Sequence, residues 1–134
     1  MSNGATCCAV PLHARSSCVT RILVIDDDVT LAELMRIVLE DAGHEVSVWS
    51  GAGDLPSGHY GAVVTDLVTL TVYDQDRTRA WVRSLTERYP GTPVIVVTAH
   101  ATARDDQGAL GAASVVIKPF DVDELLEVVR AVTS

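Results

Sequence analysis

The chain has 134 residues, with 18 acidic and 10 basic side chains and a formal net charge of −8. This length suits one domain of about 100 to 200 residues, and the acidic balance argues against direct binding of nucleic acid, whose phosphates attract clusters of basic side chains. No apolar run approaches the roughly 18 residues that cross a bilayer, and no secretory signal is visible, so we expect a cytoplasmic protein without membrane contact.

The first 20 residues show neither helical nor strand periodicity and are rich in small side chains. They predict a flexible N-terminal arm, residues 1–20, ahead of one domain, residues 21–134. All three cysteines, Cys7, Cys8 and Cys18, lie in this arm. Their odd number and spacing match neither a disulfide framework nor a zinc site, so we expect reduced thiols, whose role stays open.

The domain is predicted to open with a strand, a helix and a second strand. Residues 22–25 form a continuous apolar run, which is typical of a strand buried on both faces of a parallel sheet. Apolar side chains then recur three and four apart over residues 31–42, which predicts an amphipathic helix that starts with a Thr30-x-x-Glu33 capping box. Residues 45–48 alternate apolar and polar side chains, as in a half-exposed strand.

Three more continuous apolar runs predict buried strands, at residues 62–65, 94–97 and 115–117. Apolar side chains at helical spacing predict helices over Trp81–Tyr89 and Val122–Val132. The segments 50–61 and 101–112 are expected to cross over as short or poor helices, because the first contains Pro56 and several glycines and the second contains Gly108.

Alternating strands and helices predict a doubly wound α/β fold, with a five-stranded parallel sheet and helices on both of its faces. If the half-exposed second strand forms an edge, the strand order is 2-1-3-4-5. Ligands then bind at the carboxyl ends of the first and third strands, where the winding direction switches.

Polar residues directly follow the buried strands, and they are expected to share one edge of the sheet: Asp26, Asp27, Asp66, Thr98 and Lys118. Three carboxylates in close contact repel one another by a few kcal/mol per pair, so they require a cation. Ligands that are all oxygen favour Mg²⁺, which binds one or two carboxylates together with a phosphate. The pattern therefore predicts a phosphoryl-binding site.

Each of these residues also has a plainer interpretation when it is taken alone. Acids 26–28 could be solvated side chains at a helix N-terminus, and Asp66 or Thr98 could cap a loop. Lys118 is the one lysine beside nine arginines, which base composition alone could produce. It is their combination at the strand ends that favours the phosphoryl site.

The segments that carry these residues read ILVIDDD at 22–28, AVVTD at 62–66, VIVVTA at 94–99 and VIKPF at 116–120. In this order they resemble the receiver domain of two-component response regulators, and the resemblance covers residues 21–134. It implies that Asp66 accepts a phosphoryl group from a phosphohistidine on a sensor histidine kinase or a histidine phosphotransfer protein. Lys118 then supplies the counter-charge, and the Thr98 hydroxyl donates to a phosphoryl oxygen.

The same resemblance implies that Mg²⁺ is held by Asp26, Asp27, Asp66 and the backbone carbonyl of Val68. Val68 and His100 occupy positions that in the family influence how water reaches the acyl phosphate. An apolar Val68 predicts slow self-dephosphorylation, whereas His100 is either a solvated loop residue or a base.

The chain departs from the family pattern at three positions. Leu70 and Asp74 replace the usual proline and glycine after the phosphoryl acceptor, and Val115 replaces the aromatic residue that usually switches together with Thr98. Any switch must therefore use other side chains.

We expect a single-domain response regulator, because one helix fits between Pro119 and the last residue, Ser134. Such a protein is a phosphoprotein of a two-component or phosphorelay pathway, not an enzyme, and phosphorylation changes its interaction surface. The alternative is a degenerate receiver that acts as an interaction module without phosphorylation. The kinase, the signal, the effector, homodimer formation and origin from a longer regulator stay open.

Overall fold

The computed structural model describes residues 20–51, 53–66 and 74–133. Val68, Leu70 and residues 1–19 of the predicted arm, including its three cysteines, lie outside the described residues. Within the described part of the chain, no helix has the length and apolar character that crossing a membrane requires.

One parallel sheet forms the centre of the fold, and its strand order β2-β1-β3-β4-β5 confirms the prediction. The strands are β1 (Arg21–Ile25), β2 (Glu45–Trp49), β3 (Ala62–Asp66), β4 (Val94–Thr98) and β5 (Ser114–Ile117). The helices are α2 (Val29–Asp41), α3 (Gln75–Arg88), α4 (Thr102–Asp105), α5 (Gln107–Leu110) and α6 (Val122–Thr133).

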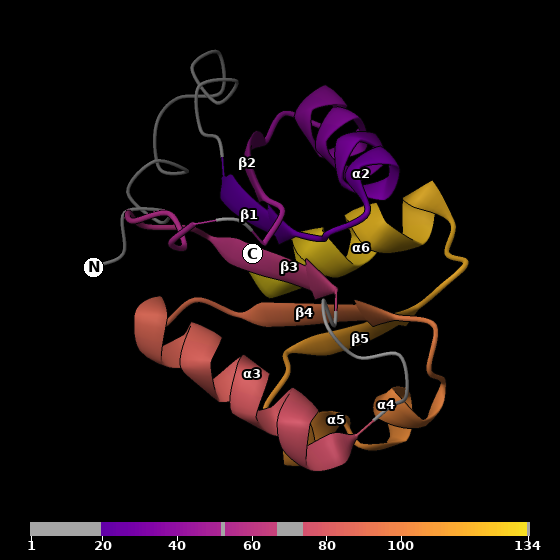
Figure 1. Ribbon diagram of the computed structural model, residues 1–134. Helices are drawn as coiled ribbons and strands as arrows, with labels where there is room; N and C mark the ends of the chain where they lie inside the picture. Colours follow the sequence, from indigo (N-terminus) through magenta and orange to yellow (C-terminus); the bar gives the residue numbers. More distant parts are fainter. Residues whose placement is uncertain (1–19, 52, 67–73, 134) are drawn as a thin grey trace.

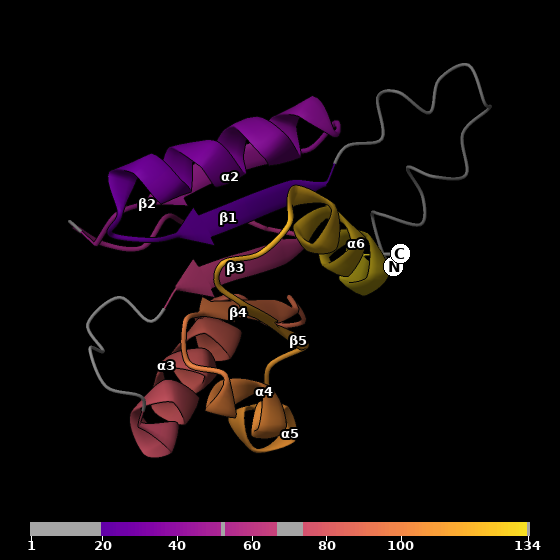
Figure 2. The same cartoon turned by 90° about the vertical axis from the view of Figure 1, so that its right-hand side faces the viewer.

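Helices cover both faces of this sheet (Figures 1 and 2). The face with Ile22 and Val24 packs against α2 and α6, and the face with Leu23 and Ile25 packs against α3, α4 and α5. Because successive side chains of a strand point to opposite faces, two buried faces require apolar residues at every position. This requirement explains the continuous apolar runs of β1, β3, β4 and β5.

Helix α2 begins two residues earlier than the capping box predicts. Its N-cap is Asp28, whose carboxylate accepts a hydrogen bond from the Leu31 backbone N–H at 3.2 Å. Glu33, the predicted capping partner, instead forms an ion pair with Arg36. The capping-box prediction was wrong because Asp28, in the turn after β1, already accepts a hydrogen bond from a free backbone N–H of the first helical turn.

Helix α3 likewise begins earlier than its apolar face indicates, at Gln75 instead of Trp81. Asp74 caps it, because its carboxylate accepts a hydrogen bond from the Arg77 backbone N–H at 3.0 Å. The first turn is polar, and residues 75–77 are exposed, so apolar periodicity could not detect it. Asp74, which replaces the family's glycine, thus has a structural role of its own.

The crossover from β2 to β3 contains no helix among its described residues, 50–51 and 53–61, so the prediction of a short helix was wrong there. Positive φ angles at Gly51 and Gly58, together with Pro56, are incompatible with a continuous helix. Leu55 and Tyr60 pack against the core in its place. The segment 101–112 does form two helices of four residues each, α4 and α5, as expected.

Hydrogen bonds attach this crossover to the end of α3. The Tyr89 hydroxyl donates to the Pro56 carbonyl at 2.5 Å, and the Arg88 guanidinium donates to the Leu55 carbonyl at 2.8 Å. The Tyr89 ring is buried and meets the Tyr60 ring edge-on, with centroids 5.4 Å apart. A loop can therefore cover the sheet where a helix was expected.

Removal of the Tyr89 hydroxyl tests this attachment. Tyr89→Phe keeps the ring but leaves the Pro56 carbonyl without its donor, which should cost about 1 kcal/mol of unfolding free energy in urea titrations. Tyr60→Phe is the matched control, because no hydrogen bond of its hydroxyl is seen among the described residues. Equal losses in the two variants would contradict the account.

Candidate functional site

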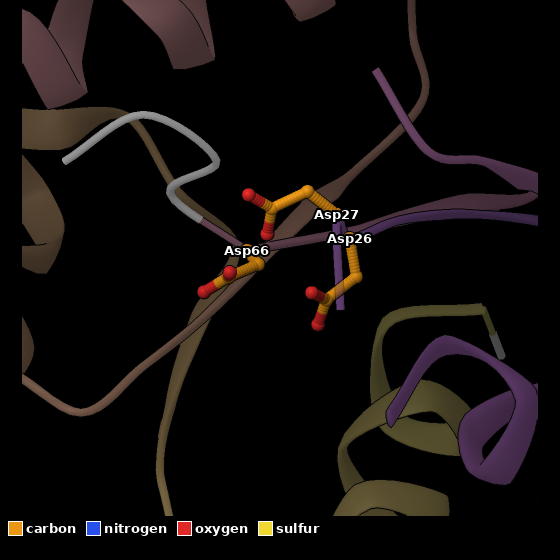
Figure 3. Close-up of side chains that lie close together, drawn as sticks. All are labelled: Asp26, Asp27 and Asp66. Atoms are coloured by element: carbon orange, nitrogen blue, oxygen red, sulfur yellow. The ribbon is translucent and has the colours of Figure 1, made fainter. Parts of the chain in front are cut away.

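The carboxyl ends of β1 and β3 bring together the three predicted acids, Asp26, Asp27 and Asp66 (Figure 3). Each offers a carboxylate oxygen, and these oxygens all lie within 4.8 Å of one another. Parallel pairing of β1 with β3 produces this arrangement, since Ile25 lies opposite Thr65 and the acids follow directly. We call these three residues the acidic cluster.

Asp26 is the buried member of the acidic cluster. Its side chain is fully inaccessible, and Oδ1 accepts a hydrogen bond from the Asp28 backbone N–H at 2.8 Å. The other oxygen, Oδ2, is buried and has no hydrogen-bond partner among the described residues. Burial raises the pKa of Asp26 above its ordinary value, although the hydrogen bond from Asp28 opposes this rise.

Lys118, at the end of β5, faces the acidic cluster. Its Nζ lies 3.1 Å from Asp66 Oδ1 and 3.7 Å from Asp26 Oδ2. The lysine side chain is 23 % exposed and that of Asp66 is 18 % exposed, so water screens this ion pair less than a surface pair. One ammonium beside three carboxylates still leaves an excess of negative charge.

Thr98 ends β4, one residue beyond the position that pairs with Asp66. It is buried, and its Oγ1 accepts a hydrogen bond from the His100 backbone N–H at 3.1 Å. The hydroxyl proton remains able to donate to a ligand at the same edge. Val115, which replaces the family's aromatic switch residue, is buried in the core beneath α4 and α5 and does not lie at this edge.

The residues of the acidic cluster fit a hard divalent cation. All their donors are oxygen atoms, their negative charge exceeds that of Lys118, and Asp26 contributes a buried oxygen without a hydrogen-bond partner. Mg²⁺ suits this set because it binds a few carboxylates and retains positions for water or phosphate. The predicted fourth ligand, the carbonyl of Val68, lies outside the described residues.

An apolar groove that the sequence analysis missed lies beside Lys118. It has a volume of about 440 Å³ and is lined by Leu31, Leu34, Ala99, Pro119, Phe120 and Val122 in addition to Lys118. Leu34 is 47 % exposed and Val122 is 41 % exposed. Leu34 belongs to the apolar pattern that predicted the helix over residues 31–42. Such a pattern does not distinguish the edge of an apolar helix face, which can be exposed, from its buried centre.

Comparisons with known proteins agree with this geometry. A family model described as the response regulator receiver domain matches residues 22–130. The response regulator ArlR of Staphylococcus saprophyticus is 30 % identical over 118 residues, which are 84 % of this chain and 51 % of that protein. ArlR of Staphylococcus aureus strain Mu50 is 28 % identical over 119 residues, 84 % of this chain and 52 % of that protein. The chain thus spans about half the length of these curated relatives.

Solved structures share the fold. The receiver domain protein of Methanospirillum hungatei has a TM-score of 0.68 at 23 % identity, covering 84 % of this chain and 92 % of that one. The response regulator TrrA of Thermotoga maritima, solved in complex with Mg²⁺ and BeF, has a TM-score of 0.64 at 24 % identity. That match covers 85 % of this chain and 99 % of TrrA. At these identities the likeness establishes the fold alone.

Magnesium should stabilise the chain through the acidic cluster. We expect Mg²⁺ to raise the thermal unfolding midpoint of the wild type, because a ligand that binds only the folded state stabilises it. Asp26→Asn should unfold at a higher temperature than the wild type in metal-free buffer, since it removes a buried charge, and should lose most of the Mg²⁺ response. The control is Asp41→Asn, at the exposed end of α2, which should respond like the wild type. An undiminished response in Asp26→Asn would contradict this assignment.

Proposed function

This chain belongs to the response regulator receiver family, and on that premise we propose that residues 21–134 accept a phosphoryl group on Asp66 from a phosphohistidine donor. Receiver domains are phosphoryl acceptors of two-component signalling, not catalytic enzymes. The observation that carries the proposal is the Asp66 carboxylate, which is only partly exposed and lies 3.1 Å from Lys118 Nζ inside the acidic cluster.

In the proposed step, an Asp66 carboxylate oxygen attacks phosphorus in line with the bond to the donor histidine. The new P–O bond forms as the P–N bond breaks, and the electron pair of that bond returns to the histidine ring. Apart from the attacking carboxylate, the protein takes no covalent part in this step, so its rate acceleration comes from positioning and charge neutralisation. The product is an aspartyl phosphate.

Lys118 and Thr98 provide the neutralisation that belongs to the chain itself. The lysine ammonium is a compact charge on a flexible stem, so it can move from the Asp66 carboxylate to a phosphoryl oxygen. The Thr98 hydroxyl donates to a second phosphoryl oxygen. Mg²⁺, held by the acidic cluster and the Val68 carbonyl, would neutralise further charge on the phosphoryl group.

The apolar groove favours a phosphoryl donor that docks through a helix, such as a sensor histidine kinase or a histidine phosphotransfer protein. Leu34 lines this groove, and Ile37, one turn further along α2, is a second exposed apolar side chain. Exposed apolar patches mark protein contacts, and a groove of this kind accepts the apolar face of a helix. The donor histidine would then lie close to Lys118.

We further propose that the chain is cytoplasmic and that its effector is a protein, not nucleic acid or a membrane. Val68 and His100 would set the lifetime of the aspartyl phosphate. Phosphorylation would switch an interaction surface. The second candidate is a degenerate receiver that binds its partner without phosphorylation. It is favoured by the burial of Val115, which replaces an aromatic switch with a side chain enclosed in the core.

Intact-mass measurement after incubation with Mg²⁺ and acetyl phosphate distinguishes the two candidates. We expect one added phosphoryl group on the wild type and on Asp41→Asn, and none on Asp66→Asn or on wild type without Mg²⁺. No adduct on a folded wild type that binds no Mg²⁺ would favour the interaction module. Sustained release of phosphate from simple esters would instead indicate a hydrolase.

A further inference from the structure

Thr65, the residue before the proposed phosphoryl acceptor, has a hydroxyl group in an otherwise apolar layer. Its side chain is fully buried, and its neighbours in the sheet register are Ile25 of β1 and Val96 of β4. A buried hydroxyl is costly unless it finds hydrogen-bond partners. The partners of Thr65 therefore indicate why a polar residue is placed there.

Trp81 of α3 supplies one partner and Asp66 the other. The indole Nε1–H of Trp81 donates to Thr65 Oγ1 at 2.9 Å, and Thr65 Oγ1 donates to the Asp66 carbonyl at 2.7 Å. A hydroxyl has a single proton, so acceptance from Trp81 leaves that proton for Asp66. The result, which we call the indole chain, runs from α3 through Thr65 to the backbone of the acceptor aspartate.

A second tryptophan holds the Trp81 ring in place. Trp49 ends β2, and its ring stacks on that of Trp81 with centroids 6.4 Å apart and planes inclined by 23°. The Trp49 carbonyl accepts a hydrogen bond from the Asp26 backbone N–H at 3.2 Å. Trp49 thus bonds the backbone of Asp26 directly, and Trp81 reaches the backbone of Asp66 through Thr65.

We infer that Trp81 is a positioning residue for phosphoryl transfer, acting through the indole chain on the orientation of Asp66. This inference rests on the proposed function of Asp66. Parallel pairing of β1 with β3 sets the spacing of the two backbones that carry the metal-binding carboxylates, and the Trp81–Trp49 stack packs on the face of the sheet that α3 covers. In-line attack tolerates little misplacement of the attacking oxygen, so the backbone of Asp66 must be held.

Packing alone would require the Trp81 ring but not its N–H group, and this difference makes the role testable. Trp81→Phe keeps a smaller aromatic ring against Trp49 and removes the N–H donor. At saturating Mg²⁺, we expect the maximal rate of phosphorylation by acetyl phosphate to fall about tenfold. The half-saturating acetyl phosphate concentration should stay unchanged, because acetyl phosphate does not touch Trp81.

Three further variants separate the indole chain from general destabilisation. Thr65→Val should slow phosphorylation as Trp81→Phe does, and the double variant should be no slower than either, because the two residues act as one unit. Thr65→Ser, which keeps the hydroxyl, should retain the wild-type rate. Tyr89→Phe, which removes a hydrogen bond at the far end of α3, should also retain it.

A readout without phosphoryl transfer comes from the indole N–H resonances in ¹⁵N-labelled protein. We expect the Trp81 resonance, assigned by its loss in Trp81→Phe, to shift when Mg²⁺ alone is added and to shift far less in Thr65→Val. A reactive wild type with an equally fast Trp81→Phe variant would overturn the role of Trp81 and leave the proposed function standing. A wild type that takes no phosphoryl group would overturn the proposed function and this role with it.

Discussion

Mutual repulsion among three carboxylates at one edge of the sheet is the constraint on which the rest of the structure depends. Parallel pairing of β1 and β3 forces Asp26, Asp27 and Asp66 together, and Asp26 is buried among them. Lys118 offsets part of this charge from the end of β5. The remaining excess makes the site receptive to a divalent cation, whose positive charge then also attracts a phosphoryl group. Removal of the lysine would leave a buried acid without a counter-charge.

The sequence was sufficient for the sheet and for the acidic cluster, because both follow from local pattern. Continuous apolar runs mark strands that are buried on two faces, and a polar residue at the end of each run lies at the shared edge. Apolar periodicity failed where polar residues form structure, as at the Asp74 cap and first turn of α3. The alternation of strands and helices failed in the β2–β3 crossover, where Pro56 and glycines stand in place of the expected short helix. The contact between Thr65 and Trp81 joins residues 16 positions apart and depends on tertiary packing.

The two faces of the sheet therefore differ in what they offer to the reactive edge. On the side of α2 and α6, an exposed apolar groove opens next to Lys118 and suits a docking protein. On the side of α3, two stacked tryptophans connect to the backbones of the acids, Trp49 directly to Asp26 and Trp81 to Asp66 through Thr65. Val115 leaves the chain without the family's aromatic switch at that position. The indole chain connects the backbone of Asp66 to helix α3.

In the proposed function, the phosphoryl group resides on the Asp66 carboxylate. Borohydride reduces an acyl phosphate to an alcohol, so an aspartyl phosphate becomes homoserine while free carboxylates are untouched. Peptide mapping after treatment with Mg²⁺, acetyl phosphate and borohydride should therefore find homoserine at position 66 and aspartate at positions 26 and 27. Homoserine at another acid, or a fully retained Asp66 in protein that carries phosphate, would contradict the account.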